Sequence, residues 1–213
     1  MNIVLVCAII GVLSGWACWF LADRLTSEAR GGVPAPRALG LLSTVGGGSL
    51  LAVAAQRSGG RVSVVVSVAI LAAPLLITLL TDAQSRLVFP VVLIPGLLAA
   101  LGIAATKPDG VLPALVSGAV AAAITTLIVV LSRWIWSSEE PPLGSGDILI
   151  TTAIGAALGP EDTLRVLFAG MVFAAVAAAA LLLTRRAGRH GVIPYGAFLC
   201  AAALVGLALE GGR

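Results

Sequence analysis

Residues 141–147 read PPLGSGD, and the apolar run ILITTAIGAALG follows directly over residues 148–159. This segment sets a carboxylate, Asp147, at the start of a hydrophobic helix, behind two glycines that allow other backbone to come close. An ionisable side chain at membrane depth costs about 2.5–3.5 kcal/mol on insertion scales, so such residues mark functional sites. A second aspartate, Asp82, lies at the edge of another apolar run, in the segment TDAQSR over residues 81–86. The function therefore depends on whether these two carboxylates meet.

The composition is that of a membrane protein. Of the 213 residues, 59% are hydrophobic and 11% are charged, whereas soluble domains carry about 25% charged residues. The apolar runs leave no room for a separate soluble domain, so we expect one integral membrane domain over residues 1–213. The net charge of +3 fits basic cytoplasmic loops. No basic cluster with interleaved aromatic residues is present, which argues against nucleic acid as a partner.

The hydrophobic pattern predicts a polytopic all-α bundle of about eight transmembrane helices. A helix needs about 20 apolar residues to cross the hydrocarbon core of a bilayer. The candidate spans are residues 2–22, 38–55, 62–80, 87–105, 111–131, 144–159, 164–184 and 192–209. The segments between them, including residues 81–86 and 160–163, are predicted to be loops or turns. The span over residues 144–159 is short and is expected to start below the membrane surface.

Loop charge predicts the orientation of the bundle. Loops alternate between the two membrane faces, and eight of the 13 Lys and Arg residues fall on one face. Because cytoplasmic loops carry the excess of basic residues, this face is predicted to be cytoplasmic and both chain termini to be external. Asp82 ends one span at that face and Asp147 begins another at the same face. The two carboxylates are therefore expected at one membrane level, where they can meet.

Two carboxylates held close together share one proton, because adjacent negative charges repel each other. Such a pair supplies a base to deprotonate water and an acid to protonate a carbonyl oxygen or a leaving amine, as peptide hydrolysis requires. The one histidine, His190, lies in an arginine-rich loop, where a solvated role is expected. The three cysteines, Cys7, Cys18 and Cys200, lie apart in apolar runs without metal-ligand spacing, so neither a metal nor a cofactor is expected.

The spacing in residues 147–159 adds a geometric argument. Asp147, Thr151, Gly155 and Gly159 recur every four residues and so form one stripe of a helix. Small residues along a stripe let a neighbouring helix approach closely in a bilayer. The pattern therefore predicts that Asp147 points into a tight helix interface rather than toward lipid.

Four blocks of residues resemble the motifs of a known family. They are Gly15 with Arg24-Leu25; Asp82 with Arg86, Pro90, Pro95 and Gly96; Gly144, Gly146 and Asp147 with Gly155 and Leu158-Gly159; and IPYGAFL over residues 193–199. In order and spacing the chain resembles the type IV prepilin peptidases, which belong to the G-x-G-D class of intramembrane aspartyl proteases.

The resemblance implies a protease of the inner or plasma membrane that cleaves prepilin or pseudopilin precursors at the cytoplasmic face. Asp82 and Asp147 are implied as the catalytic pair, with Gly144, Gly146 and Arg86 as supporting residues of the active site. The implied substrates carry a short basic leader that ends in glycine and is followed by an apolar helix of about 20 residues.

Three positions depart from the family pattern. The loop over residues 25–37 stands where long members insert a cytosolic domain with two C-x-x-C pairs, so N-methyltransferase activity is not expected. Trp19 occupies the position of the usual asparagine, and Leu149 that of the usual lysine after the second aspartate. Two alternatives to a protease stay open: a carrier that couples protons or cations through the two aspartates, and an inactive homologue that takes part in pilus or secretion assembly.

Overall fold

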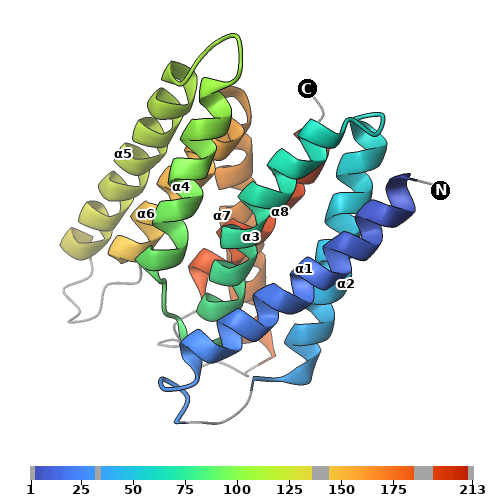
Figure 1. Cartoon of the computed structure of the whole chain (residues 1–213). Coiled ribbons are helices and arrows are strands. Elements are labelled where there is room, and N and C mark those ends of the chain that lie inside the picture. The colour runs from blue at the N-terminus through green and yellow to red at the C-terminus, as the bar shows by residue number, and fades with distance from the viewer. Residues whose placement is uncertain (1–2, 32–34, 136–143, 185–193, 211–213) are drawn as a thin grey trace.

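The computed structural model describes residues 3–31, 35–135, 144–184 and 194–210. Within these residues all regular structure is α-helical, and eight helices follow one another along the chain (Figure 1). They are α1 (Ile3–Thr26), α2 (Arg37–Arg57), α3 (Val62–Ser85), α4 (Pro90–Ala105), α5 (Leu112–Ile135), α6 (Ser145–Leu158), α7 (Pro160–Leu183) and α8 (Tyr195–Glu210). The predicted polytopic helical bundle is confirmed.

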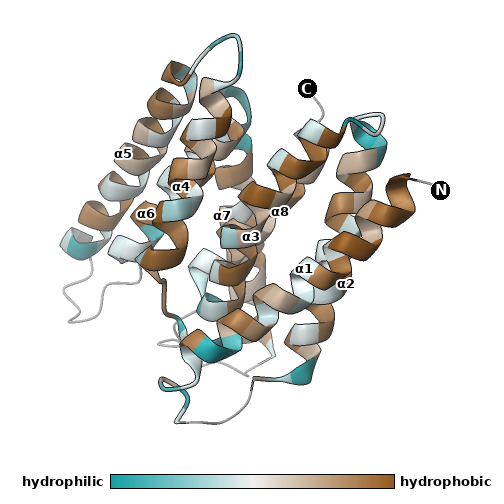
Figure 2. Cartoon of the chain, viewed as in Figure 1, coloured by the Kyte–Doolittle hydropathy of each residue, from teal (hydrophilic) through white to brown (hydrophobic). Residues whose placement is uncertain are grey.

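The helices fall into two length classes. Helices α1, α2, α3, α5 and α7 are long and apolar enough to cross a membrane, and apolar residues cover most of their length (Figure 2). Helices α4, α6 and α8 have 16, 14 and 16 residues, which at a rise of 1.5 Å per residue gives roughly 21–24 Å. The hydrocarbon core is about 30 Å thick, so each of these three helices is shorter than that core.

The loop predictions were wrong at two places. Residues 81–86 are not a loop, because α3 continues to Ser85 and ends at Arg86, whose left-handed backbone has a φ of 56°. Residues 160–163 are not a turn but the first turn of α7. Proline is favoured at the first helical position, where its fixed φ fits and its missing N–H has no intrahelical partner, and acidic residues favour the first turn.

Glycines allow helices α1 and α2 to pack closely. A methyl group at Gly11 would collide with the backbone at Gly47, and one at Gly15 would collide with Ser43. The Ser43 hydroxyl donates a hydrogen bond to the Gly15 carbonyl oxygen at 2.6 Å. Close backbone approach with a serine hydrogen bond across it is a common way to join helices where apolar burial gives little driving force.

The predicted stripe on α6 is partly confirmed. A methyl group at Gly155 would lie 2.6 Å from the Ser117 carbonyl oxygen of α5, and the Ser117 hydroxyl donates to the Gly155 carbonyl oxygen at 2.9 Å. Gly159 does not take part, because it follows the last residue of the helix and ends it with a φ of 80°. The tight interface of α6 is thus made with α5 and is centred on Gly155.

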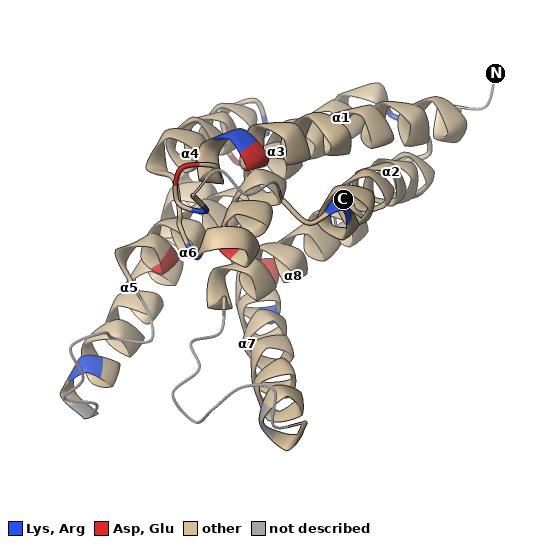
Figure 3. Ribbon diagram, turned by 90° about the horizontal axis from the view of Figure 1, so that it is seen from below, with Lys and Arg blue, Asp and Glu red and all other residues tan. Residues whose placement is uncertain are grey.

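The chain reverses direction at each connection, so one end of the bundle gathers the end of α3 and the starts of α4, α6 and α8 (Figure 1). The start of α1 and the end of α8 lie at the opposite end (Figure 1). All three short helices therefore begin at the end where α3 stops. Figure 3 looks onto this end and shows few charged residues among the helices.

Candidate active site

Asp82 lies in the last turn of α3, where it is 6% exposed. Its Oδ2 accepts a hydrogen bond from the backbone N–H of Ala197 at 2.7 Å. Ala197 is the third residue of α8, and the first N–H groups of a helix have no partner within it. The Asp82 carboxylate therefore caps a helix from another part of the chain and lies at the positive end of its dipole.

Gly196 makes room for this carboxylate. A methyl group at Gly196 would lie 3.1 Å from the Asp82 Oδ2 and 2.8 Å from the Ile150 Cδ1 of α6. Helices α3, α6 and α8 thus converge on one residue that has no side chain. Gly196 and Ala197 fall within the IPYGAFL motif over residues 193–199, but the motif does not reveal their role, because a backbone donor leaves no signal in residue type.

Asp147 is the third residue of α6 and lies in the first turn of that helix. Its Oδ2 accepts a hydrogen bond from the backbone N–H of Gly144, the N-cap residue, at 2.9 Å. This is one half of a capping box, in which the third helical residue reaches back to the N-cap backbone. Each of the two aspartates therefore lies at a helix N-terminus, Asp82 at that of α8 and Asp147 at that of α6.

The structure places both aspartates at one end of the bundle, Asp82 in the last turn of α3 and Asp147 in the first turn of α6 (Figure 1). Both helices also meet the start of α8, because a methyl group at Gly196 would touch the Asp82 carboxylate and Ile150, which follows Asp147 by three residues. That the two carboxylates act as a pair stays a prediction.

The three residues that the resemblance implies as supporting residues lie near one or the other aspartate. Gly144 supplies the N–H that caps Asp147. A methyl group at Gly146 would lie 2.8 Å from the Cβ of Val88, in the segment between α3 and α4, so glycine lets α6 start against that segment. Arg86 is exposed, and its backbone N–H donates to the Asp82 carbonyl oxygen at 2.9 Å.

Leu149, where the family usually has lysine, is half-buried and packs against the hydrophobic core. At this position the chain therefore has an apolar side chain that packs in the core. Among the described residues, no group of three or more His, Cys, Asp or Glu side chains gathers where it would hold a metal ion. His190, Glu139 and Glu140 lie outside the described residues.

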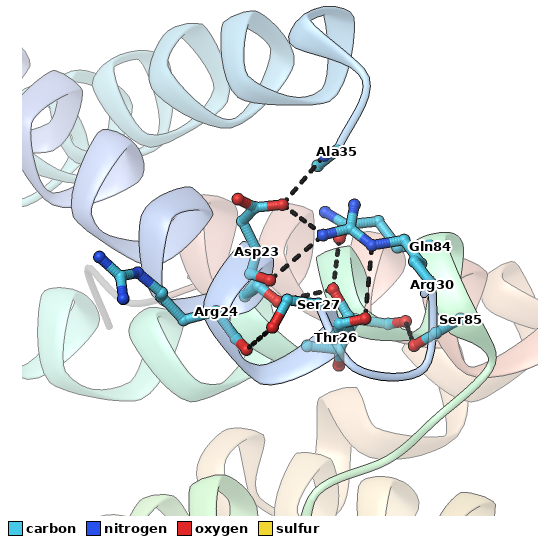
Figure 4. Close-up of polar contacts among 10 residues, drawn as sticks. Asp23, Arg24, Thr26, Ser27, Arg30, Ala35, Gln84 and Ser85 are labelled. Atoms are coloured by element: carbon cyan, nitrogen blue, oxygen red, sulfur yellow. Dashed lines mark hydrogen bonds and ion pairs between the residues drawn. The ribbon is translucent and has the colours of Figure 1, made fainter. Parts of the chain in front are cut away.

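A polar cluster joins α1 to the last turn of α3, the turn that carries Asp82 (Figure 4). The buried Thr26 hydroxyl donates to the Gln84 Oε1 at 2.8 Å. Arg30 forms an ion pair with Asp23, and the Asp23 Oδ1 also accepts the Ala35 N–H at 2.9 Å. The cluster therefore fastens the end of α1 and the segment after it to α3, two residues beyond Asp82.

Two buried donors in this cluster, the Gln84 Nε2 and the Arg30 Nη1, have no partner among the described residues. The hydrogen bond from Thr26 to the Oε1 is therefore the one that holds the half-buried Gln84 side chain among the described residues. None of these side chains was singled out from the sequence, because the contact joins residues 58 positions apart.

A family model described as the type IV leader peptidase family matches residues 69–179, slightly more than half of the chain. The chain belongs to the type IV leader peptidase family. The matched segment runs from the middle of α3 into α7 and contains both Asp82 and Asp147. Searches of curated proteins and of solved structures gave no match.

The matched segment ends before α8. The Ala197 N–H and Gly196 lie beyond residue 179, as do all of α8. The contact between Asp82 and α8 is therefore a finding of the structure alone.

Proposed function

We propose that the chain is an aspartic endopeptidase that removes the leader from prepilin-like precursors, with Asp82 and Asp147 as its catalytic pair. The observation that supports the proposal is that two carboxylates lie at one end of the bundle, each bonded to a backbone N–H at a helix N-terminus. Family membership supports a leader peptidase, and the implied partners are prepilin or pseudopilin precursors and the lipid bilayer.

In the proposed mechanism the pair holds one proton between its two carboxyl groups. The ionised carboxylate takes a proton from a water molecule, and the water oxygen attacks the carbonyl carbon of the scissile peptide bond. The protonated carboxyl group gives its proton to the carbonyl oxygen, which produces a neutral tetrahedral intermediate. The intermediate collapses when its C–N bond breaks: the carboxyl group that took the water proton gives it to the nitrogen, and one hydroxyl group of the intermediate gives its proton to the other carboxylate. The pair is then again singly protonated.

The helix N-termini contribute to this chemistry. The Ala197 N–H holds the Asp82 carboxylate at 2.7 Å, and the Gly144 N–H holds the Asp147 carboxylate at 2.9 Å. Because these donors belong to helical backbone, they fix each carboxylate without adding a titratable group. Both carboxylates keep one oxygen that is not used in these two bonds, and these oxygens are the ones we assign to water and to the substrate carbonyl.

The orientation in the membrane is part of the proposal. The excess of basic residues in the loops at the end of the bundle that holds the pair supports a cytoplasmic active site and external termini. A multi-pass protein of the inner or plasma membrane in this orientation meets the basic leader of a precursor before that leader crosses the bilayer. Location of both acids at one end, rather than near the midplane, disfavours a carrier.

The test is cleavage of a synthetic precursor by the protein reconstituted in liposomes. The precursor has a basic leader ending in glycine, an apolar helix and a C-terminal tag. Asp82→Asn and Asp147→Asn are each expected to lower the initial rate about 1,000-fold or more, because each removes one proton-transfer group. Asp109→Asn is the matched control, since Asp109 is an exposed carboxylate in the turn that follows α4. Cleavage at more than about a tenth of the wild-type rate by either active-site variant contradicts the mechanism.

A further inference from the structure

An apolar groove of about 500 Å³ runs between α2, α3 and α8, with two residues of α1 at its base. Its walls are aliphatic and small residues, and the exposed Leu42, Val205 and Leu209 stand along it. On α2 the lining extends from Leu39 to Val53, which at 1.5 Å per residue corresponds to roughly 21 Å. The groove is therefore long enough to hold several turns of an apolar helix.

One end of the groove lies close to Asp82 along α3 and α8. The α3 wall ends with Leu79 and Leu80, and Asp82 follows two residues later. The α8 wall begins at Ala201, one helical turn after Ala197, whose N–H binds the Asp82 carboxylate. The two helices that form the groove are thus the two that join at Asp82.

A glycine in the groove wall has no packing partner. Gly47 and Gly48 of α2 are in tight contact with α1, but a methyl group at Gly46 would meet no atom of the described residues within 4 Å. Gly46 is exposed and lines the groove. Glycine is a poor helix former, so its presence here is not explained by the fold of the chain. Small residues on a helix surface in a bilayer allow another helix to approach closely.

We propose that this groove docks the apolar helix of the precursor, so that the bond at the junction of leader and helix lies at Asp82 and Asp147. The inference rests on the proposed function and adds where the substrate binds. An apolar helix that follows a basic leader matches a groove with apolar walls, two of whose helices, α3 and α8, join at Asp82. The helix packs along Gly46 on one side and along Val205 on the other.

The first experiment fills the groove. Gly46→Phe is compared with Gly102→Phe, since Gly102 of α4 is also an exposed helical glycine with no atom of the described residues within 4 Å of an added methyl group. Each variant is assayed on the full precursor and on a peptide that spans the cleavage site but lacks the apolar helix. The measured quantity is the ratio of kcat/KM for the precursor to kcat/KM for the peptide. Gly46→Phe is expected to lower this ratio about tenfold or more, while Gly102→Phe leaves it within about twofold of wild type.

The second experiment identifies what occupies the groove. A photo-crosslinking residue replaces Val205 in the groove or, as a control, Leu98 on the exposed side of α4, in the inactive Asp147→Asn background. The proposal expects an adduct with the apolar helix of the precursor at Val205 and little or none at Leu98. Adducts with phospholipid alone, or equal adducts at the two positions, overturn it.

The two experiments separate the two proposals. If wild type cleaves the precursor and Gly46→Phe leaves the ratio unchanged, the groove is not the docking site and the proposed function stands. If wild type cleaves neither substrate but the Val205 adduct with the precursor forms, the docking site stands and the proposed function fails.

Discussion

The Asp82 carboxylate of α3 caps the first turn of α8 by accepting the Ala197 N–H at 2.7 Å, across 115 residues of sequence. This hydrogen bond joins a candidate catalytic residue to a helix that lies outside the segment matched by the family model. It places Asp82 beside Gly196, where no side chain intervenes between α8 and the carboxylate. The position of Asp82 is therefore set by α8 as much as by α3.

The first prediction concerns Gly196. In Gly196→Ala the added methyl group would lie 3.1 Å from the Asp82 Oδ2 and 2.8 Å from the Ile150 Cδ1, so the carboxylate must move and its bond to Ala197 weakens. Because misplacement of a catalytic group by about 1 Å costs roughly 100-fold, kcat is expected to fall about 10- to 100-fold with a smaller change in KM. The measurement is steady-state cleavage of the synthetic precursor.

Gly206→Ala is the matched control for this change. It lies on the same helix and crowds Val166 at 2.7 Å, away from the aspartates. Its kcat is expected to stay within about threefold of wild type. Equal kcat for the two variants would show that crowding of α8, and not displacement of Asp82, causes the loss.

The second prediction concerns the stability of the α5–α6 interface. Gly155→Ala places a methyl group 2.6 Å from the Ser117 carbonyl oxygen and 2.9 Å from the Gly118 Cα, so the two backbones must separate. Overpacking of this kind costs about 1–3 kcal/mol of the free energy of unfolding. Gly102→Ala, which meets no described atom within 4 Å, is expected to be neutral or to stabilise by up to about 1 kcal/mol. Reversible unfolding in mixed micelles measures the free energy of unfolding of both variants. A Gly155→Ala variant that is as stable as Gly102→Ala contradicts the packing of α5 against α6.

The third prediction concerns the polar cluster at the C-terminal end of α1. Thr26→Val removes the hydroxyl that donates to the Gln84 Oε1 at 2.8 Å and leaves a buried amide without that partner. The expected loss is about 1–3 kcal/mol of the free energy of unfolding. Ser27→Ala is the control, because its hydroxyl bonds to the Arg24 carbonyl oxygen at an exposed position, and a change within about 0.5 kcal/mol is expected.

A double-mutant cycle with Gln84→Leu isolates this contact. If Thr26 and Gln84 stabilise the fold through their contact, the loss in the free energy of unfolding of the double variant should be smaller than the sum of the two single losses. The expected difference is at least about 0.5 kcal/mol. Strict additivity would mean that the two side chains act independently.

The number and order of the helices were predictable because each helix is an apolar run bounded by polar or helix-breaking residues. Helix ends were less predictable. Residues 81–86 read as a polar loop, yet hydroxyl groups of the last α3 turn bond to backbone carbonyl oxygens, as the Ser85 hydroxyl does with Thr81 at 2.9 Å. These bonds satisfy polar side chains within the helix, so α3 extends to Ser85 and carries Asp82 with it.

The candidate site was predictable to the extent that it depends on side chains. Alternating loops placed Asp82 and Asp147 at one level, and a G-x-G-D pattern marked the start of α6. The Ala197 N–H was not predictable, since every residue but proline has such a group and only tertiary packing decides which one meets a carboxylate. The groove likewise depends on how α2, α3 and α8 pack, which hydropathy alone does not determine.

The central claim is that Asp82 and Asp147 act as one unit. The direct test compares cleavage rates of the synthetic precursor by Asp82→Asn, Asp147→Asn and the double variant, with protein in liposomes checked to be inserted and folded. Residues that act as a unit are strongly non-additive, so the double variant is predicted to retain the same residual rate as each single variant within about threefold. A double variant whose loss is the product of the two single losses, or a single variant with more than about a tenth of wild-type activity, would contradict the account.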